Sequence, residues 1–254
     1  MGTNTSDGRN EPLRPAQVEK AEVYVLVDNV SDLLSSVPSS VKPEVANLLE
    51  AGAEEISGEC LCCAHWGLSL IITAERDGIR HTVLFDSGPE AYAVDRNGDR
   101  LGIDFGGIEA IVLSHGHWDH AGGMLAALDQ IRAANGGEAV PFHVNPGMFV
   151  SRASKNLSKR TIPFKDIPSV DELTTHGAEV VNDGGSRLLL DDMFYLSGEI
   201  PRVTSYEKGL PGHMKRTADG TDWEPDPLIM DERFLAVDVV DKGVIVFTAC
   251  SHAG

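Results

Sequence analysis

The segment LSHGHWDHAGG (113–123) places three histidines and one aspartate close together, at His115, His117, Asp119 and His120. Imidazole and carboxylate groups are the ligands that zinc, iron and manganese accept in proteins. His115 and His117 are two positions apart, so in an extended segment their side chains point the same way. The pattern therefore predicts a metal site. A packed or solvent-exposed histidine cluster is the plainer alternative.

The elements on either side of this cluster should hold it in place. IEAIVLS (108–114) has the apolar pattern of a short buried strand, and loops that leave rigid strands commonly carry binding residues. DHAGGMLAALDQIRAAN (119–135) has an acidic, glycine-containing start and ends before a glycine pair, which predicts a helix. The cluster therefore lies between the end of a strand and the start of a helix.

Strand patterns dominate the rest of the sequence. Two hairpins are predicted at 68–88 and 233–250, which turn at Asp77-Gly78 and at Asp241-Lys242-Gly243. The remaining signals predict strands at 21–29, 140–145 and within 187–198, a helix within 43–53, and irregular structure over 150–185. Strands mixed with helices in this order predict an α+β fold, with sheets covered by helices in a layered αββα body.

Length and composition set limits on the class of protein. The chain has 254 residues, of which 42% are hydrophobic, enough for one large domain with a buried core. We expect a disordered polar leader at 1–20 and one domain at 21–254. The leader lacks the hydrophobic core of a secretion signal, and no apolar run approaches the ~18 residues of a membrane span. These features favour a cytoplasmic protein.

Charge and cysteine content restrict the partners. The formal net charge of −18 repels phosphate backbones, so we expect no nucleic acid and no membrane partner, and a small-molecule substrate instead; the oligomeric state is left open. Three of the four cysteines, Cys60, Cys62 and Cys63, are crowded together, and the fourth is Cys250. Side chains of the adjacent Cys62 and Cys63 would alternate faces in a strand, so ordinary reduced thiols are expected before a thiolate metal site.

The motif HGHWDH matches the H-x-H-x-D-H signature, and through it the sequence resembles the metallo-β-lactamase superfamily. VLFDSGPE (83–90), LSGEIPR (196–202) and FTACSHAG (247–254) extend the resemblance to one branch of it. Members of that branch are named dihydropterin-linked ribofuranosyl-aminobenzene 5'-phosphate synthases or β-lactamase superfamily II hydrolases. The resemblance covers roughly residues 21–254. It implies an αββα sandwich with a metal site along one edge of its two sheets, and two divalent ions, zinc first, with iron or manganese as alternatives.

By position, the resemblance implies that His115 and His117 bind one ion, and that Asp119 and His120 bind the second. Asp119 would also position the nucleophile, which makes it a candidate catalytic residue. Asp86 would lie beneath the ions and accept a hydrogen bond that orients a ligand imidazole. The alternative for Asp86 is an ordinary turn residue before Ser-Gly.

The sequence departs from the superfamily pattern at two places. Where many members have Gly-His-Thr, this chain has Ser197-Gly198-Glu199, so Glu199 is a candidate ligand or base, with a solvated carboxylate as the alternative. Where many members have a bridging aspartate, this chain reads Ala249-Cys250-Ser251-His252. We take His252 as the metal ligand there, with Cys250 as second choice.

Two further residues are candidates for substrate binding. Arg202 follows Glu199 closely and could contact a substrate carboxylate or phosphate through its guanidinium, while a solvated arginine is the alternative. His143 ends a predicted strand near the cluster and could line the pocket, or simply pack. His65 could flank the site. We interpret the remaining histidines, His81, His176 and His213, as surface residues.

The resemblance also implies a further strand, a helix and a last histidine after the segment that ends at Gly254, so the domain is expected to be C-terminally incomplete. The function expected is that of a metal-dependent hydrolase-type enzyme, in which a metal-bound hydroxide attacks a small-molecule substrate at a mono- or dinuclear site. Two alternatives stay open. One is the pterin-related synthase reaction named for the branch, and the other is a non-catalytic metal-binding or ligand-sensing protein.

Overall fold

A computed structural model of the chain describes residues 13–155 and 160–253. The helices are α1 (Glu44–Glu50), α2 (Ala91–Leu101), α3 (Trp118–Ala121), α4 (Met124–Ala134) and α5 (Val170–Thr175), with short 3-10 turns at Phe105–Gly107 and Pro146–Met148. The strands are β1 (Gln17–Val18), β2 (Lys20–Val27), β3 (Ser69–Arg76), β4 (Ile79–Phe85), β5 (Ala110–Val112), β6 (Val140–Val144), β7 (Arg152–Ser154), β8 (Ile162–Pro163), β9 (Ala178–Asn182), β10 (Arg187–Leu189), β11 (Phe194–Leu196), β12 (His213–Arg216), β13 (Trp223–Pro225), β14 (Leu235–Val239) and β15 (Gly243–Phe247).

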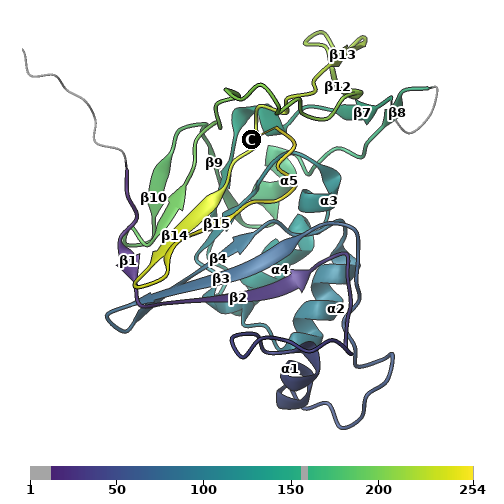
Figure 1. Ribbon diagram of the computed structural model, residues 1–254. Coiled ribbons are helices and arrows are strands. Elements are labelled where there is room, and N and C mark those ends of the chain that lie inside the picture. Colours follow the sequence, from purple (N-terminus) through teal and green to yellow (C-terminus); the bar gives the residue numbers. More distant parts are fainter. Residues whose placement is uncertain (1–12, 156–159, 254) are drawn as a thin grey trace, which may run out of the picture.

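These strands form three sheets. The largest has six strands in the order β2-β3-β4-β5-β6-β9, and its strands from β4 to β9 run parallel. A five-stranded sheet has the order β1-β14-β11-β10, with β15 also paired to β14. A small four-stranded sheet has the order β13-β12-β7-β8 and lies at one end of the molecule (Figure 1). The parallel strands end at one edge of the large sheet, where connecting loops can bring functional side chains together.

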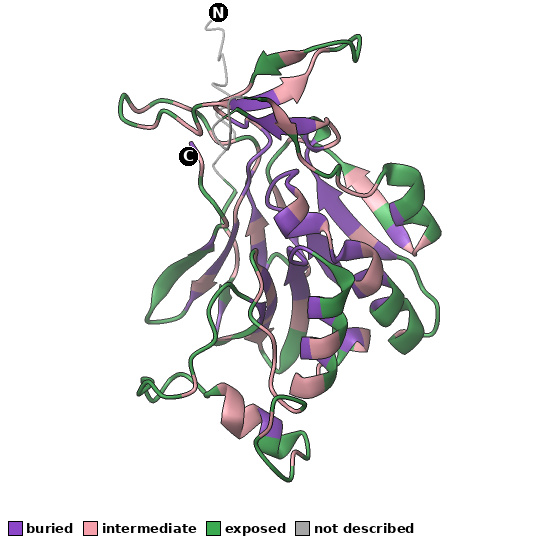
Figure 2. Cartoon of the chain, turned by 90° about the vertical axis from the view of Figure 1, so that its right-hand side faces the viewer, coloured by how far each residue is buried: buried purple, intermediate pink, exposed green. Residues whose placement is uncertain are grey.

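Two buried clusters hold the layers together. One lies between the six-stranded sheet and its helices and includes Leu84, Val94 and Leu128; the other lies between the two larger sheets and includes Val83, Phe85 and Val237. Neighbouring residues of β4 thus face different layers, as strand alternation requires. Figure 2 shows the buried residues concentrated in the central strands. The α+β prediction of stacked sheets with covering helices is confirmed; the described helices that enter a core cluster all pack on the six-stranded sheet.

Several sequence predictions are confirmed with small changes in their bounds. The first hairpin turns at Asp77 and Gly78, which both have positive φ as a tight two-residue hairpin turn requires. The helix predicted at 119–135 is two helices, α3 and α4, because the backbone at Gly122 and Gly123 lies directly against carbonyl oxygens of Pro89 and Ser87. A side chain at either glycine would collide with that backbone. These glycines therefore place the start of α4 against the loop that follows β4.

The prediction of a leader at 1–20 was wrong in its boundary. Residues 1–12 lie outside the described residues. Gln17 and Val18 form β1, which pairs in parallel with β14, and Val18 is completely buried in the core between the sheets. A single apolar residue among polar neighbours does not produce the alternating hydrophobic pattern of a strand, so this strand could not be recognised from the local sequence.

Two other features were not predicted. Helix α2 has a weak pattern because it contains Asn97 and Gly98, but Gly98 lets the helix approach Phe105, and Gly102 ends it in the left-handed region. The region over 150–185, which was expected to be irregular, contributes β7, β8, α5 and β9. Among the described residues, no helix is both long and apolar enough to span a membrane.

Candidate metal centre

The histidine cluster lies where β5 ends, at the edge of the six-stranded sheet. His115 and His117 are in the loop after β5, and Asp119 and His120 are in the first turn of α3. All four are buried, with between 1% and 9% of their surface exposed. Burial of this many polar side chains in one place is costly unless they have partners or hold an ion. The cluster is therefore a buried group of polar side chains and not a solvated loop.

Gly116 fixes the path of the loop between the two histidines. A Cβ atom at this position would lie 2.3 Å from the carbonyl oxygen of Met148, so no side chain fits. Its N–H donates to Oδ2 of Asp231 over 2.8 Å, and Oδ1 of Asp231 accepts from Nη2 of Arg152 over 2.7 Å. This buried ion pair thus anchors the loop to the strand β7 of the small sheet.

Three imidazoles form the first group of candidate ligands. Nε2 of His115 lies 2.9 Å from Nδ1 of His117, and one nitrogen of His252 completes a set whose ligand atoms all lie within 4.8 Å of one another. Nε2 of His252 is buried and has no hydrogen-bond partner among the described residues. A nitrogen lone pair left in this position, facing two other imidazoles, fits a shared cation.

His120 belongs to a second group. Its Nδ1 lies 2.7 Å from Oδ2 of Asp86, and its Nε2 lies 3.2 Å from Sγ of Cys250. His115, His120 and Cys250 also have their ligand atoms within 4.8 Å of one another. His115 is therefore shared by the two groups. Imidazole nitrogens together with a thiolate are a donor set typical of zinc.

Asp86 lies beneath the cluster, as the sequence prediction placed it. The residue is completely buried at the end of β4 and has a positive φ of 58°. Besides His120, its carboxylate accepts from the backbone N–H and the hydroxyl of Ser114, each over 2.7 Å. Because a carboxylate accepts hydrogen bonds, it favours the proton of His120 on Nδ1 and leaves Nε2 to face Cys250.

Asp119 has a different environment. Its Oδ2 accepts from the indole N–H of Trp66 over 3.1 Å and lies 3.6 Å from Nε2 of His120. It belongs to neither of the two compact ligand groups among the described residues. The carboxylate thus lies beside His120, with an exposed tryptophan ring next to it; 66% of the Trp66 surface is accessible.

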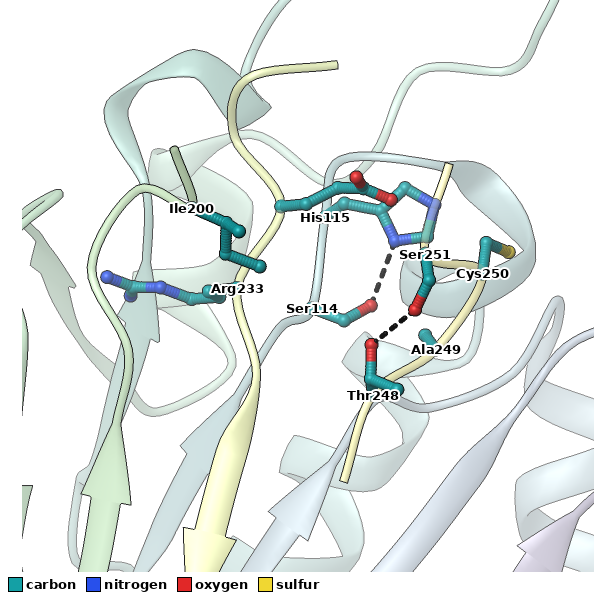
Figure 3. A pocket seen from close by; sticks show the side chains of 9 residues that line it. Ser114, His115, Ile200, Arg233, Thr248, Ala249, Cys250 and Ser251 are labelled. Carbon is teal, nitrogen blue, oxygen red and sulfur yellow. Dashed lines mark hydrogen bonds between the residues drawn. The ribbon is translucent and has the colours of Figure 1, made fainter. Parts of the chain in front are cut away.

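The last described segment, 248–253, forms one wall of the centre. Thr248, Cys250 and Ser251 line a small pocket together with Ser114 and His115 (Figure 3). Glu232 holds this segment in place, because its carboxylate accepts from the backbone N–H groups of His252 and Ala253 over 2.7 and 3.2 Å. Burial raises the pKa of Glu232, although those two N–H groups and Arg202 oppose the shift.

The electrostatics of the three imidazoles suit a cation. Burial, assisted by the neighbouring histidines, lowers the pKa of His115 well below its usual value. Burial and the charge of Arg152 lower the pKa of His117, and burial lowers the pKa of His252 to about 4. These rings are therefore neutral at pH 7, which is the form that binds metal. For His120, burial also lowers the pKa, but the Asp86 carboxylate outweighs this and raises it.

Three of the candidate residues lie elsewhere than predicted. Glu199 is exposed, and only its backbone N–H, which donates to the carbonyl of Gly184, has a described partner. Arg202 is a correction: its guanidinium donates to the carbonyls of Ile200, Leu228 and Ile229 and pairs with Glu232, so it is used inside the protein. No local pattern indicates these partners, most of which lie 26 to 30 residues away.

His143 is also a correction. It is 6% exposed and lies in neither ligand group, so it does not line an open pocket. Burial, with the charges of Arg187 and Arg233 nearby, lowers its pKa to about 4. The strand position was predicted correctly, but its side chain faces the interior between the two larger sheets, where Val112 is its neighbour on β5.

His213 was the main omission, since it was interpreted as a surface residue. It is 1% exposed, and its Nε2 lies 2.9 Å from Nε2 of His117. The pair Gly212-His213 was a usable signal, because many superfamily members have a Gly-His-Thr pattern after the cluster, but that place was assigned to Ser197-Gly198-Glu199 instead. Cys250, the second choice to His252, turns out to lie beside His120 while His252 lies beside His115 and His117.

Comparisons with known proteins show which sequences and folds this chain is similar to. Residues 69–191 match the family model of the metallo-beta-lactamase superfamily. The chain is 30% identical over 191 residues to a curated relative from Methanocaldococcus jannaschii, named 7,8-dihydropterin-6-methyl-4-(beta-D-ribofuranosyl)-aminobenzene-5'-phosphate synthase. That match covers 74% of this chain and 62% of the relative, so the chain spans less than two thirds of the relative's length.

The fold is also similar to solved structures. A crystal structure described as a metal-dependent hydrolase of the beta-lactamase superfamily superposes with a TM-score of 0.57 at 19% identity. The superposition covers 91% of this chain and 66% of that chain. At this identity the likeness concerns the fold, which agrees with the helix-covered, two-sheet sandwich of this chain.

Proposed function

We propose that this chain, of which residues 69–191 match the family model of the metallo-beta-lactamase superfamily, is a metal-dependent hydrolase-type enzyme that acts on a small-molecule substrate. The observation that carries the proposal is the set of neutral imidazoles of His115, His117 and His252, two of them buried and the third half-buried, whose ligand atoms all lie within 4.8 Å of one another. The proposed cofactor is one or two divalent ions, zinc first, with iron or manganese as alternatives. When bound, such ions supply Lewis acidity and make water a stronger nucleophile near neutral pH.

In this proposal the residues of the centre have different roles. His115, His117 and His252 hold one ion, and His120 and Cys250, together with the shared His115, hold the second. Asp86 keeps the proton of His120 on Nδ1, so that Nε2 presents its lone pair. The carboxylate of Asp119 lies beside His120 and is the group placed to orient the attacking water and to accept its proton.

One observation favours the synthase as a second candidate. The indole of Trp66 is exposed and is anchored to Asp119 by its N–H, so a flat apolar surface lies at the edge of the metal centre. Flat aromatic rings stack on such surfaces. The relative from M. jannaschii is named as the synthase of a compound with pterin and aminobenzene rings, and a ligand of that class would suit Trp66.

Turnover measured on protein of known metal content tests the proposal. Zinc-loaded protein is screened on ester, lactone and phosphodiester substrates, and on a pterin with an aminobenzene ribofuranosyl phosphate. We expect turnover that is lost in His120→Ala and kept in His176→Ala, a histidine that pairs with Asp129 away from the centre. Metal binding without turnover on any substrate would favour the non-catalytic alternative. Equal activity in His120→Ala would contradict the assignment.

Two variants of Trp66 distinguish the hydrolase candidate from the synthase candidate. If ring stacking on Trp66 determines the substrate, Trp66→Leu should raise KM for the pterin-containing substrate by roughly tenfold, while Trp66→Phe keeps most of the binding. A simple ester or lactone without a ring should show no such difference between the two variants.

A further inference from the structure

His213 reaches the metal centre from outside the large sheets. It begins β12 and pairs with Ser154 of β7, within the small four-stranded sheet. The ring is buried, and Phe164, which follows β8, packs edge-on against His117 with ring centroids 5.7 Å apart and lies 6.2 Å from the ring of His213. The small sheet therefore places one imidazole, shielded by an aromatic ring, behind His117.

The hydrogen bonds of His213 determine where its proton lies. Nδ1 of His213 is 2.7 Å from the backbone carbonyl oxygen of Asp226. A carbonyl oxygen only accepts, so Nδ1 must carry the proton. The side chain is only 1% exposed, and the single ring proton of a neutral imidazole is then on Nδ1, which leaves the lone pair on Nε2.

That lone pair faces His117. The two Nε2 atoms are 2.9 Å apart, which is a hydrogen-bond distance, and such a bond needs one donor. Because Nε2 of His213 carries no proton, Nε2 of His117 must donate. The neutral ring of His117 then has its lone pair on Nδ1, which is the atom that lies 2.9 Å from Nε2 of His115.

We infer that His213 is a positioning residue: it accepts the Nε2 proton of His117 and so presents the Nδ1 lone pair of His117 to the ion. The chain of hydrogen bonds runs from the Asp226 carbonyl through His213 to His117. Histidines that bind metals generally donate their other N–H to such a partner, and loss of the partner costs about 10–100-fold in metal affinity. The inference rests on the metal centre of the proposed function.

The geometry also separates this role from direct ligation. Among the described residues, His213 is in neither of the groups whose ligand atoms lie within 4.8 Å of one another. Its Nε2 contacts Nε2 of His117, which is the ring nitrogen opposite the Nδ1 that lies near His115. A positioning residue should change the affinity of the ion, whereas a ligand should change the number of ions bound.

Two measurements test the inference. The first is nitrogen-15 NMR of histidine-labelled, metal-free protein, which identifies the protonated nitrogen of each neutral ring. We expect His117 to carry its proton on Nε2 and His213 on Nδ1 in the wild-type protein, and His117 to lose this preference in His213→Leu. A wild-type His117 protonated on Nδ1 would overturn the inference. This measurement needs no bound metal, so it stands even if the proposed function fails.

The second is the affinity for Zn²⁺ alone, by competition with a chelator. His213→Leu should bind the same number of ions about 10–100-fold more weakly. His213→Gln should stay within a few-fold of wild type, since its carbonyl can accept from His117 while its amide donates to Asp226. Unchanged affinity in His213→Leu, or loss of one ion in both variants, would overturn the inference. If circular dichroism shows that His213→Leu does not fold, the test rests on His213→Gln. In that case a Zn²⁺ affinity of His213→Gln about 10-fold weaker than wild type would overturn the inference.

Discussion

Nδ1 of His120 lies 2.7 Å from Oδ2 of Asp86, and both side chains are buried at the end of β4 and the start of α3. This contact joins two segments that are 34 residues apart in sequence. It ties the loop after the first hairpin to the histidine cluster. Because the carboxylate accepts the proton on Nδ1, the contact determines that Nε2 of His120 is the nitrogen available to an ion.

Replacement of Asp86 by Asn tests that contact. Asn tolerates the positive φ at this position, so the backbone should be unaffected. The amide cannot accept all the bonds that the carboxylate accepts, so we expect zinc affinity to fall about 10–100-fold and the free energy of unfolding to fall by about 1–3 kcal/mol. Chelator competition and urea denaturation measure the two effects. Asp77→Asn, at the exposed hairpin turn with the same backbone conformation, is the control. Equal zinc affinity in both variants would refute the role of Asp86.

Gly122 should tolerate no side chain. A Cβ atom there would lie 1.8 Å from the carbonyl oxygen of Pro89, and neither backbone can move without displacing α3. We expect Gly122→Ala to lower the free energy of unfolding by about 3 kcal/mol or more. Gly58→Ala is the matched control, because a Cβ atom at Gly58 meets nothing within 4 Å and should change stability by less than about 0.5 kcal/mol. Similar urea midpoints for the two variants would show that the loop after β4 is not packed closely against Gly122.

His81 should make stability depend on pH. Burial lowers its pKa, but hydrogen bonds to Glu109 and Asp191 outweigh burial and raise it above the ordinary value. A raised pKa means that the stabilisation is complete below about pH 6.5 and is lost as pH rises through the pKa of the folded state. Wild type should therefore exceed His81→Gln by about 0.5–1 kcal/mol at pH 6, and this difference should shrink by pH 9. A difference that grows with pH would have the wrong sign for this explanation.

The cysteines should differ in reactivity. Burial, with the carboxylate of Glu44 nearby, raises the pKa of Cys62 to about 12, so its thiolate is scarce at pH 8. Cys250 is exposed and lies beside His120. We expect iodoacetamide to label Cys250 much faster than Cys62 in metal-free protein, and zinc to protect Cys250 while leaving Cys60 unchanged. Peptide mass spectrometry measures the extent of labelling at each cysteine. If zinc leaves the labelling of Cys250 unaltered, the group of His115, His120 and Cys250 does not hold an ion.

The sequence predicted the parts of the site that depend on short-range pattern. HGHWDH indicated the cluster directly, and the strand before it was predicted from its local apolar pattern, whereas the break between α3 and α4 was not predicted. Asp86 and His252 were also named, although only the resemblance to a family connected them with the cluster. What these residues share is a position at the end of a clearly patterned strand.

The residues that the sequence placed wrongly depend on long-range packing. His213 meets His117 across 96 positions, through a small sheet whose strands have no clear periodicity. Arg202 looked free to bind a substrate, but carbonyls and a carboxylate far along the chain use its guanidinium. Val18 lies alone in a polar segment and is buried only because β14 pairs beside it. In each case the partner is remote, and a local pattern carries no information about it.

The most direct test of the metal centre is the zinc content of the purified protein by plasma mass spectrometry, after loading and dialysis. His115 is shared by both ligand groups, so we expect one or two ions per chain in wild type and in His176→Ala, and almost none in folded His115→Ala. Full zinc content in His115→Ala, or none in folded wild type, would contradict the assignment of a metal centre to this cluster.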